Sequence, residues 1–352
     1  MSRVLLLGVG PLPAPGALRV HATGLRLRAF LNALKSEGLK VRCLELPFGG
    51  SAPTGGAEEG VERLSGDIAT ARSEFDRALA DFSPDVVFAL TDIGAQIAAE
   101  SAWKGPLYVD YNGHPMTERA EQCRAHGNNT ALAAQWLGVL PVLLRADRFS
   151  VVSWAQRAAL LGELGVAGRL NAETCHHDLV DVLPPNLPFQ LPLEVVDAKR
   201  LQSFGVPAEA PVILSTGGFN TWMDEATLFA ALERVFASHS TARFLATGGG
   251  IPGHVEIVYE RFQAAASASP FAARYHFAGW IEHEAFLDCL QLATVAVNSE
   301  HASLEGEFGF RNRLLGWAWG GLGIVTHVTG EATARLVGQG FARAVPTADA
   351  AA

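Results

Sequence analysis

Short apolar runs alternate with longer stretches of helical periodicity from one end of the chain to the other. The runs contain little polar alternation, as expected of parallel strands whose two faces are both covered. The longer stretches place apolar side chains on one helical face. Gly24–Glu37 is an example, with Leu27, Phe30, Leu31 and Leu34 on that face. The alternation predicts an α/β fold built on parallel sheets.

The predicted elements fall into two arrays. The first array has strands at Val4–Leu7, Val41–Leu44, Val86–Leu90, Leu107–Val109 and Phe149–Val152, and helices at Gly24–Glu37, Val61–Phe82, Ile93–Ala102, Thr130–Arg145 and Trp154–Leu164. The second array has strands at Val212–Ser215, Arg243–Thr247, Tyr275–Phe277, Val295–Asn298, Ile324–Thr326 and Arg343–Val345, and helices at Asp224–Ser238, Val255–Ala266, His283–Leu292, Phe310–Trp319 and Ala332–Gly338.

A proline-rich segment separates the two arrays. Residues 184–192 contain four prolines, which neither a helix nor a central strand tolerates. We therefore predict a Rossmann-like acceptor domain over residues 1–185, a linker over 186–207 and a Rossmann-like donor domain over 208–352, with the two parallel-sheet domains facing each other across a cleft. The glycine-rich segment Gly49–Gly60 is expected to be a flexible loop at the rim of that cleft. The final PTADAAA resembles the beginning of a helix, so we expect the second domain to lack its closing helix.

The charge balance limits the classes of partner. The chain of 352 residues carries 27 Lys and Arg against 36 Asp and Glu, for a net charge of −9. Nucleic-acid-binding proteins usually present a basic face, so nucleic acid is not an expected partner. An anionic small molecule would have to be bound by a few local arginines and backbone N–H groups.

The cysteines and the start of the chain indicate a cytoplasmic protein. The four cysteines lie far apart without a CxxC pair, which is typical of a reduced protein with incidental thiols. The segment MSRVLLLGVGPLP fits a first strand better than a signal peptide. No apolar run approaches about 18 residues, so no transmembrane helix is expected. Peripheral contact with a membrane stays open.

Polar residues gather in the stretch 295–331. An apolar run, Val295–Val297, ends in Asn298 and Ser299. Glutamates and arginines then follow, at Glu300, Glu305, Glu307, Arg311 and Arg313. Ligands of open α/β sheets bind at the carboxyl ends of strands. Carboxylates, guanidinium groups and a helix N-terminus at such an edge suit a sugar attached to a diphosphate.

Three segments of the second half resemble one enzyme family. They are ILSTGGFNTWMDEATLFAAL, FAGWIEHEAFLDCLQLATVAVN and SLEGEFGFRNRLLGWAWGGLGIVTHVTGE. In this order they are similar to the large retaining, nucleotide-sugar-dependent group of GT-B glycosyltransferases, in its family-4-like branch. The resemblance covers about residues 208–346. It implies transfer of a hexose from a nucleoside diphosphate sugar to an acceptor hydroxyl, with retention and without a cofactor or a metal. The acceptor would be a saccharide, a lipid-linked molecule or a small molecule.

The resemblance implies a donor site in the second half. Gly217 and Gly218 would let a diphosphate approach backbone N–H groups, although a plain βα turn is the alternative. Gly248 and Gly249 would border the nucleobase, with a plain turn as the alternative. The other expected donor contacts are Asn220, Trp280, Ser303, Leu304 and Glu307, with a core tryptophan as the alternative for Trp280.

Arg311 and Arg313 are the predicted partners of the diphosphate. At i, i+2 spacing they cannot share one helix face, so we expect one in the cleft and one bound to Glu305 or Glu307. Glu305 takes the place of the family's cleft carboxylate, which would support positive charge at the anomeric carbon. Glu300 and Glu307 compete for that role, and two structural arginines are the alternative.

The glycine loop of the first half departs from the dinucleotide fingerprint. Gly8 and Gly10 begin a GxG pattern without the third glycine of GxGxxG, and only Glu45 could bind a ribose, so nicotinamide and flavin enzymes are disfavoured. The residues that we place on the acceptor side are Gly10, His21, Arg26, Asp92, Asp110 and His114. An internally satisfied loop histidine is the alternative for His114.

No metal site is predicted. The run Cys175-His176-His177-Asp178 contains ligand types, but adjacent ligands rarely converge on one ion and no spaced partner pair accompanies them.

Two departures from the family pattern leave the activity open. The acidic residue that grips the donor ribose in the family falls on Gly316, and the usual proline after Gly-Leu is Gly323. A degenerate sugar-nucleotide-binding protein without transferase activity is therefore a second hypothesis. A sugar-nucleotide epimerase or phosphorylase on the same fold is a third. No pattern encodes the donor base, the sugar, the acceptor or the oligomeric state.

Overall fold

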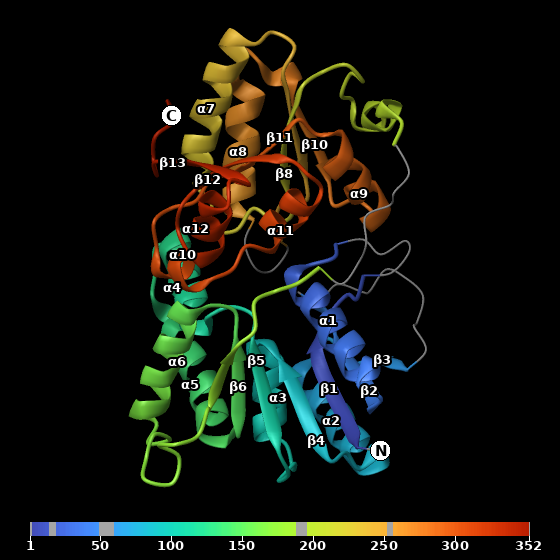
Figure 1. Cartoon of the computed structure of the whole chain (residues 1–352), viewed down its shortest axis with the longest axis vertical. Helices are drawn as coiled ribbons and strands as arrows, with labels where there is room; N and C mark the ends of the chain where they lie inside the picture. The colour runs from blue at the N-terminus through green and yellow to red at the C-terminus, as the bar shows by residue number, and fades with distance from the viewer. Residues whose placement is uncertain (1, 14–18, 49–59, 188–195, 252–255, 352) are drawn as a thin grey trace. The chain divides into compact units, whose positions relative to one another are not determined.

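The computed structural model describes residues 2–13, 19–48, 60–187, 196–251 and 256–351. The chain divides into two compact units, which are Met1–Pro188 with Phe308–Phe310, and Phe189–Glu307 with Arg311–Ala352. Each unit is a parallel sheet with helices packed on it (Figure 1). The prediction of two Rossmann-like parallel-sheet domains is confirmed.

The first unit contains a seven-stranded sheet in the order β3-β2-β1-β4-β5-β6-β7, with all pairs parallel. Its strands are β1 (Arg3–Val9), β2 (Lys40–Leu46), β3 (Val61–Arg63), β4 (Val86–Leu90), β5 (Leu107–Tyr111), β6 (Arg148–Val151) and β7 (Val180–Val182). The order reverses between β1 and β4, so the connections that leave these two strands diverge.

The helices of the first unit begin and end at recognisable capping residues. They are α1 (Ala22–Ser36), α2 (Ile68–Phe82), α3 (Thr91–Glu100), α4 (Pro115–His126), α5 (Thr130–Arg145) and α6 (Trp154–Val166). The Asp67 side chain accepts from the Thr70 N–H at the start of α2, and Ser153 accepts from the Gln156 N–H at the start of α6. Gly127 ends α4 in the left-handed conformation.

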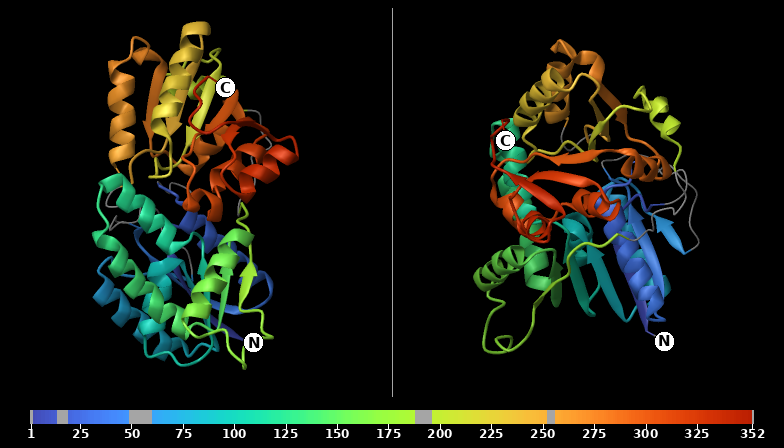
Figure 2. Two further views of the ribbon diagram at one scale, coloured as in Figure 1. Left: turned by 90° about the vertical axis from the view of Figure 1, so that its left-hand side faces the viewer. Right: turned by 45° about the horizontal axis from the view of Figure 1, so that its top comes forward.

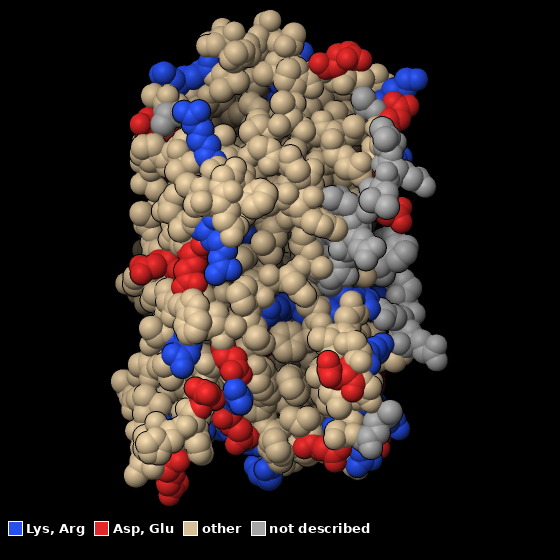
Figure 3. All heavy atoms as spheres, viewed as in Figure 1, with Lys and Arg blue, Asp and Glu red and all other residues tan. Residues whose placement is uncertain are grey.

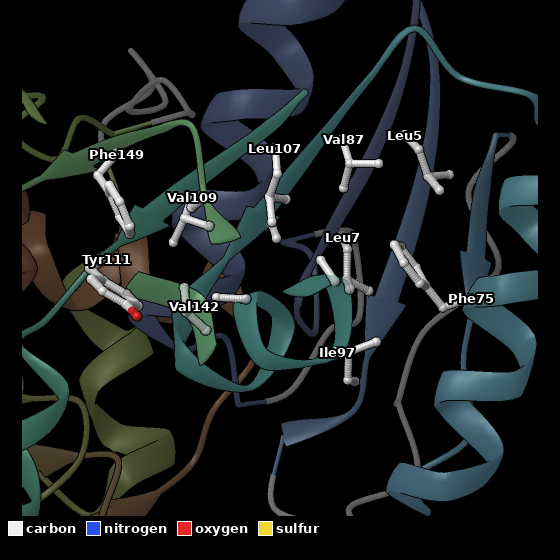
Figure 4. Packing of buried hydrophobic residues seen from close by; sticks show 14 of the residues in the cluster. Leu5, Leu7, Phe75, Val87, Ile97, Leu107, Val109, Tyr111, Val142 and Phe149 are labelled. Atoms are coloured by element: carbon white, nitrogen blue, oxygen red, sulfur yellow. The ribbon is translucent and has the colours of Figure 1, made fainter. Parts of the chain in front are cut away.

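The two faces of the first sheet pack against different helices. Leu5 and Leu7 of β1 lie in one buried cluster with Phe75 of α2 and with side chains from α3, α5 and α6 (Figure 4). Leu6 points to the opposite face, where it packs with Leu27 of α1. The uninterrupted apolar sequence of β1 therefore reflects burial on both faces.

The second unit repeats this design with a six-stranded parallel sheet in the order β10-β9-β8-β11-β12-β13. Its strands are β8 (Val212–Thr216), β9 (Arg243–Thr247), β10 (Tyr275–Gly279), β11 (Val295–Asn298), β12 (Gly323–His327) and β13 (Ala342–Val345). The order reverses between β8 and β11.

Helices cover both sides of the second sheet, as Figure 2 shows. They are α7 (Glu225–Ser238), α8 (Ile257–Ala268), α9 (His283–Leu292), α10 (Leu304–Phe308), α11 (Asn312–Trp319) and α12 (Glu331–Gly338), with 3-10 turns η2 (Ala198–Phe204) and η3 (Ala272–Arg274). Phe236 of α7, Phe244 of β9 and Phe262 of α8 form the centre of an aromatic core on one side.

The differences from the predicted elements have local causes. The helix predicted from Val61 is instead the short strand β3 followed by α2, because Asp67 fixes the helix start through a 2.9 Å bond from the Thr70 N–H. The apolar pattern does not predict β7, α4 or α10. The sequence of α4, PMTERAEQCRAH, lacks an apolar face, and α10 has only five residues in a stretch expected to be a loop.

Charged side chains are interspersed on the face drawn in Figure 3, where Lys and Arg lie among Asp and Glu instead of forming one basic surface. Within the described ranges, no helix combines the length and the hydropathy needed to cross a bilayer. Most of the predicted rim loop (49–59) and part of the predicted linker (188–195) lie outside the described residues, whereas the linker's remainder contains η2.

Candidate functional site

The loops that follow β8 and β11 form the edge at which the second sheet reverses its order. They are joined by backbone hydrogen bonds. The Asp224 N–H donates to the Ser299 carbonyl at 3.1 Å, and the His301 N–H donates to the Trp222 carbonyl at 2.9 Å. Such a switch point is the usual ligand position in an open α/β sheet. The stretch with the concentrated polar residues therefore lies at the edge of the sheet where ligands of this fold class usually bind.

Arg311 lies at this edge in a buried cluster with two carboxylates. Its Nε donates to Glu300 at 2.7 Å, and its two terminal nitrogens donate to the two oxygens of Glu305 at 2.9 and 2.5 Å. Thr329 adds a 2.8 Å bond to the second oxygen of Glu300. Every nitrogen of the Arg311 guanidinium is thus bound to a carboxylate, which leaves little capacity for a phosphate.

The ion pairs decide the charge states in this cluster. Burial opposes the charged form of Glu300, but the Arg311 charge and hydrogen bonds from Arg311, Thr329 and Asn298 hold its pKa below the usual value. Burial likewise opposes the charged form of Arg311, and the two carboxylates raise its pKa above the usual value. Glu300 and Arg311 are therefore both ionised at neutral pH.

Glu305 is bound within the cluster. Its side chain is 3% exposed and both of its oxygens accept from Arg311. These bonds give Glu305 a structural role, and the catalytic role expected for it stays a prediction. Arg311 is the one of the two arginines that binds Glu305. Glu307 is exposed.

Arg313 has a different environment from Arg311. Its guanidinium is half-buried and donates one hydrogen bond, at 2.8 Å, to the Gly218 carbonyl. No described carboxylate forms an ion pair with it. Burial and the neighbouring Arg311 charge lower the pKa of Arg313 to about 10, so it stays cationic at neutral pH. A partly desolvated cation with unused donors is suited to binding an anion.

Both arginines lie at the beginning of α11, with Arg311 at the N-cap and Arg313 in the first turn. No acidic residue occupies that turn. Cations are disfavoured at the positive end of a helix dipole by roughly 0.3–1 kcal/mol each. This local conflict is a sign that positive charge at this place serves binding.

Glycines line the ends of three neighbouring strands. Gly217, Gly248 and Gly279 follow or end β8, β9 and β10, and each has a positive φ, of 80°, 110° and 68°. A Cβ on Gly248 would lie 2.2 Å from the Gly217 carbonyl oxygen, so a side chain is excluded there. The strand ends consequently present backbone to a ligand.

The hydrogen bonds of these glycines correct one detail of the predicted site. The Gly217 N–H donates to the Thr247 carbonyl at 2.6 Å, and the Gly248 N–H donates to the Gly279 carbonyl at 2.6 Å. Neither N–H is free for a phosphate. The Gly218 N–H has no hydrogen-bond partner within the described ranges, which leaves it as the donor of this turn.

Asn220 and Trp280 lie in the loops beside this row. The Asn220 side-chain oxygen is buried and makes no hydrogen bond to a described residue. The Trp280 indole N–H donates to the Gly250 carbonyl at 3.1 Å and so ties the loop after β10 to the loop after β9. A Cβ on Gly249 would lie 3.0 Å from the Tyr259 ring.

The remaining donor residues surround the short helix α10. Ser303 accepts from the Gly306 N–H at 3.1 Å, so its hydroxyl caps the turn. Leu304 is 61% exposed. Gly316 lies buried on α11, and a Cβ there would be 3.8 Å from Phe286 and 3.9 Å from Leu290, an ordinary contact distance.

The side chain of Glu45 packs against the glycine turn at Gly10 in the first unit. A Cβ on Gly10 would lie 2.4 Å from the buried Glu45 carboxyl group, whose oxygens accept from the Leu12 N–H at 3.1 Å and from Arg63 at 3.3 Å. The Glu45 carboxylate therefore lies beside Gly10 and binds the N–H that follows this turn. The acceptor-side contact expected at Gly10 stays a prediction.

Arg26 and Asp110, which were predicted on the acceptor side, bind each other. Arg26 donates to Asp110 at 3.0 and 2.7 Å and to the carbonyls of Leu183 and Pro184 at 2.8 and 3.3 Å. Asp110 also accepts from the Ser150 hydroxyl. These contacts fix the chain after β7 to the sheet, and the acceptor-side role expected for the two residues stays a prediction.

The last three acceptor-side predictions resolve into local roles. His114 is the N-cap of α4 and accepts from the Thr117 N–H at 3.3 Å, while its other nitrogen lies 3.3 Å from Glu163. Asp92 lies in the first turn of α3 and accepts from Gln135. The His21 ring stacks on Phe48 with 4.3 Å between centroids. No acceptor contact is assigned to these residues.

No group of three or more His, Cys, Asp and Glu side chains suited to a metal ion occurs in the part of the chain that the structure describes. The thiol of Cys175, in the run that contains ligand types, is exposed.

Comparisons with known proteins agree with this fold. No family model and no curated protein matches the sequence. Similar solved structures include sucrose-phosphate synthase from Thermosynechococcus elongatus, with a TM-score of 0.72, 15% identity and coverage of 99% of this chain and 87% of that chain. HepE from Anabaena, in complex with UDP-glucose, has a TM-score of 0.67, 16% identity and the same coverages. WaaG, a glycosyltransferase involved in lipopolysaccharide biosynthesis, has a TM-score of 0.63, 12% identity and coverages of 98% and 86%. The protein therefore has the GT-B fold predicted from its sequence.

Proposed function

We propose that the protein binds a nucleoside diphosphate sugar in its second unit and transfers the hexose to an acceptor hydroxyl. The observation that carries the proposal is the half-buried Arg313 guanidinium, which contacts the Gly218 carbonyl and pairs with no described carboxylate. Its place at the reversal of a Rossmann-like sheet suits a diphosphate.

In the proposed reaction the bond between the anomeric carbon and the diphosphate oxygen breaks. Negative charge then grows on the diphosphate, where the Arg313 guanidinium and the Gly218 N–H would stabilise it. The acceptor oxygen bonds to the anomeric carbon and its proton passes to the departing phosphate. This course uses no protein base, which agrees with the engagement of Glu305 by Arg311. Retention and independence from metal are parts of the proposal that rest on the sequence resemblance.

Uridine is the first base to test. Among the similar structures, Anabaena HepE was solved with UDP-glucose and an E. coli protein with UDP-2-fluoro glucose. The acceptor hydroxyl belongs to a saccharide, a lipid-linked molecule or a small molecule in this proposal.

A second candidate is a sugar-nucleotide-binding protein without turnover. Gly316 favours it, because glycine supplies no carboxylate for a ribose and its Cβ direction leads to Phe286 and Leu290. The two candidates agree on binding and differ in turnover.

A thermal-shift screen of UDP, GDP, ADP, TDP and CMP sugars followed by product analysis tests the proposal. A ligand at 100 times its Kd stabilises the native state by about 2.7 kcal/mol, enough to raise the Tm measurably. Transfer of hexose to a supplied acceptor supports the transferase. Binding without release of nucleotide supports the second candidate. A screen in which no sugar nucleotide raises the Tm contradicts both.

A further inference from the structure

Trp222 lies in the loop between β8 and α7, four residues beyond Gly218. Its ring covers the Arg311 guanidinium, with 4.7 Å between the guanidinium carbon and the ring centroid. The side chain is half-buried, and no other aromatic ring among the described residues stacks on it. One part of the indole is therefore packed while another is exposed at the switch-point edge.

The indole is held in a defined position. Three of the five N–H groups of Arg311 donate to Glu300 and Glu305, which fixes the orientation of the guanidinium under the Trp222 ring. A cation over an indole is worth about 0.5–2 kcal/mol. The Trp222 backbone is fixed as well, because its carbonyl accepts from the His301 N–H at 2.9 Å. An aromatic surface held in this way is preorganised for a ligand.

The distance from the phosphate position limits what Trp222 can reach. Four residues span at most about 14 Å, so the indole lies within one sugar nucleotide's length of Arg313 and Gly218. The ring offers no charge for a phosphate. It offers a flat apolar surface and one N–H, which suit the face of a hexose that carries axial C–H groups.

We propose that Trp222 is a specificity residue whose ring stacks on the hexose of the bound donor, with Arg311 as the positioning residue that orients the ring. The inference rests on the proposed function, since it names a contact of the same donor. It also gives the Arg311 cluster a role, because that cluster has no charge left for the diphosphate itself.

The test distinguishes the contribution of the hexose to binding affinity from that of the nucleoside diphosphate. Isothermal titration calorimetry would measure the Kd of a sugar nucleotide and, separately, the Kd of the matching free nucleoside diphosphate. The pairs are UDP-glucose and UDP, GDP-mannose and GDP, and ADP-glucose and ADP, and the pair that the wild type binds is used. We expect Trp222→Ala to raise the Kd of the sugar nucleotide about 5- to 10-fold and that of the free diphosphate less than about 2-fold. Trp222→Phe should recover most of the difference, because a phenyl ring retains a stacking face.

Trp154→Ala is the matched control. Trp154 is an exposed indole that also forms a cation–π pair, with Arg157 at 5.7 Å, but it belongs to the first unit. This variant should leave both Kd values unchanged. Equal weakening of sugar nucleotide and free diphosphate by Trp222→Ala, or no weakening of either, would overturn the inference and leave the proposed function standing. A wild type that binds none of the six ligands would overturn both.

Discussion

The carboxyl ends of β1 in the first sheet and of β8 in the second are equivalent positions, since each sheet reverses its order beside that strand. Both strands end in a glycine turn, but the two turns face opposite charges. The turn at Gly10 is filled by the Glu45 carboxylate, whereas Arg313 lies on the turn at Gly218. The same topology therefore places a carboxylate at one glycine turn and a guanidinium at the other.

Each unit also contains a buried arginine that is fully engaged. Arg26 binds Asp110 and two carbonyls, and Arg311 binds Glu300 and Glu305. A buried arginine is thus no indication of an anion site by itself. What distinguishes the second unit is a further arginine, Arg313, that forms no ion pair with a described carboxylate.

The largest expected effect is on the stability of the first unit. Arg26→Met leaves the buried Asp110 without its cation, so we expect the free energy of unfolding to fall by about 3–5 kcal/mol. Hydrogen exchange of peptides from β5 and β6 would measure it, and donor affinity should not change. The control Arg42→Met removes an exposed pair with Glu62 and should cost less than about 1 kcal/mol. Similar losses in the two variants would contradict a structural role specific to Arg26.

The next effect is on ligand affinity. Arg313→Gln removes the charge beside Gly218, and we expect the Kd of the sugar nucleotide to rise about 10- to 100-fold, or about 1.4–2.7 kcal/mol. Calorimetry would measure it, with the melting temperature of the free protein as a check on folding. Arg200→Gln is the control, because Arg200 is an exposed partner of Asp288 in the same unit. Unchanged affinity in Arg313→Gln would remove the basis of the proposed function.

A smaller effect is expected on the stability of the second unit at acidic pH. The Arg311 charge holds the pKa of Glu300 in the folded protein below the ordinary value of a glutamate, so the ionised carboxylate stabilises the fold at pH values above that ordinary pKa. This contribution is lost as the pH falls through the folded pKa. Hydrogen exchange of the β11–α11 region between pH 3 and 6 should show weakening protection at the acid end. Glu300→Gln should be less stable at pH 7 and show a shallower dependence on pH, and a slope equal to that of the wild type would argue against this assignment.

The smallest effect concerns Gly316. A methyl group there meets Phe286 and Leu290 at ordinary contact distances, so Gly316→Ala should stabilise α11 by about 0.5–1 kcal/mol. Comparison of Gly316→Asp with Gly316→Ala then isolates the carboxylate. Tighter binding of a ribonucleotide than of its 2′-deoxy analogue by the aspartate variant, by about 2- to 3-fold, would indicate a vestigial ribose position. Equal affinities would exclude one.

The fold could be predicted from the sequence because the apolar runs that mark its strands are local features of the chain. Apolar runs such as Val86–Leu90 and Val295–Asn298 coincide with observed strands, since a doubly covered parallel strand must be apolar throughout. The misassigned start of α2 and the unpredicted α4 depend on capping at Asp67, His114 and Gly127, which apolar periodicity does not record.

The sequence alone determined the two α/β arrays and the stretch with the concentrated polar residues, because periodicity and composition are properties of neighbours along the chain. Only the tertiary structure decided which of those charged residues form ion pairs with one another and which do not. Arg311 and Arg313 are two positions apart, yet one faces two carboxylates and the other faces a backbone carbonyl. Pairing of charges depends on distances across the sheet edge, and no spacing along the chain specifies those distances.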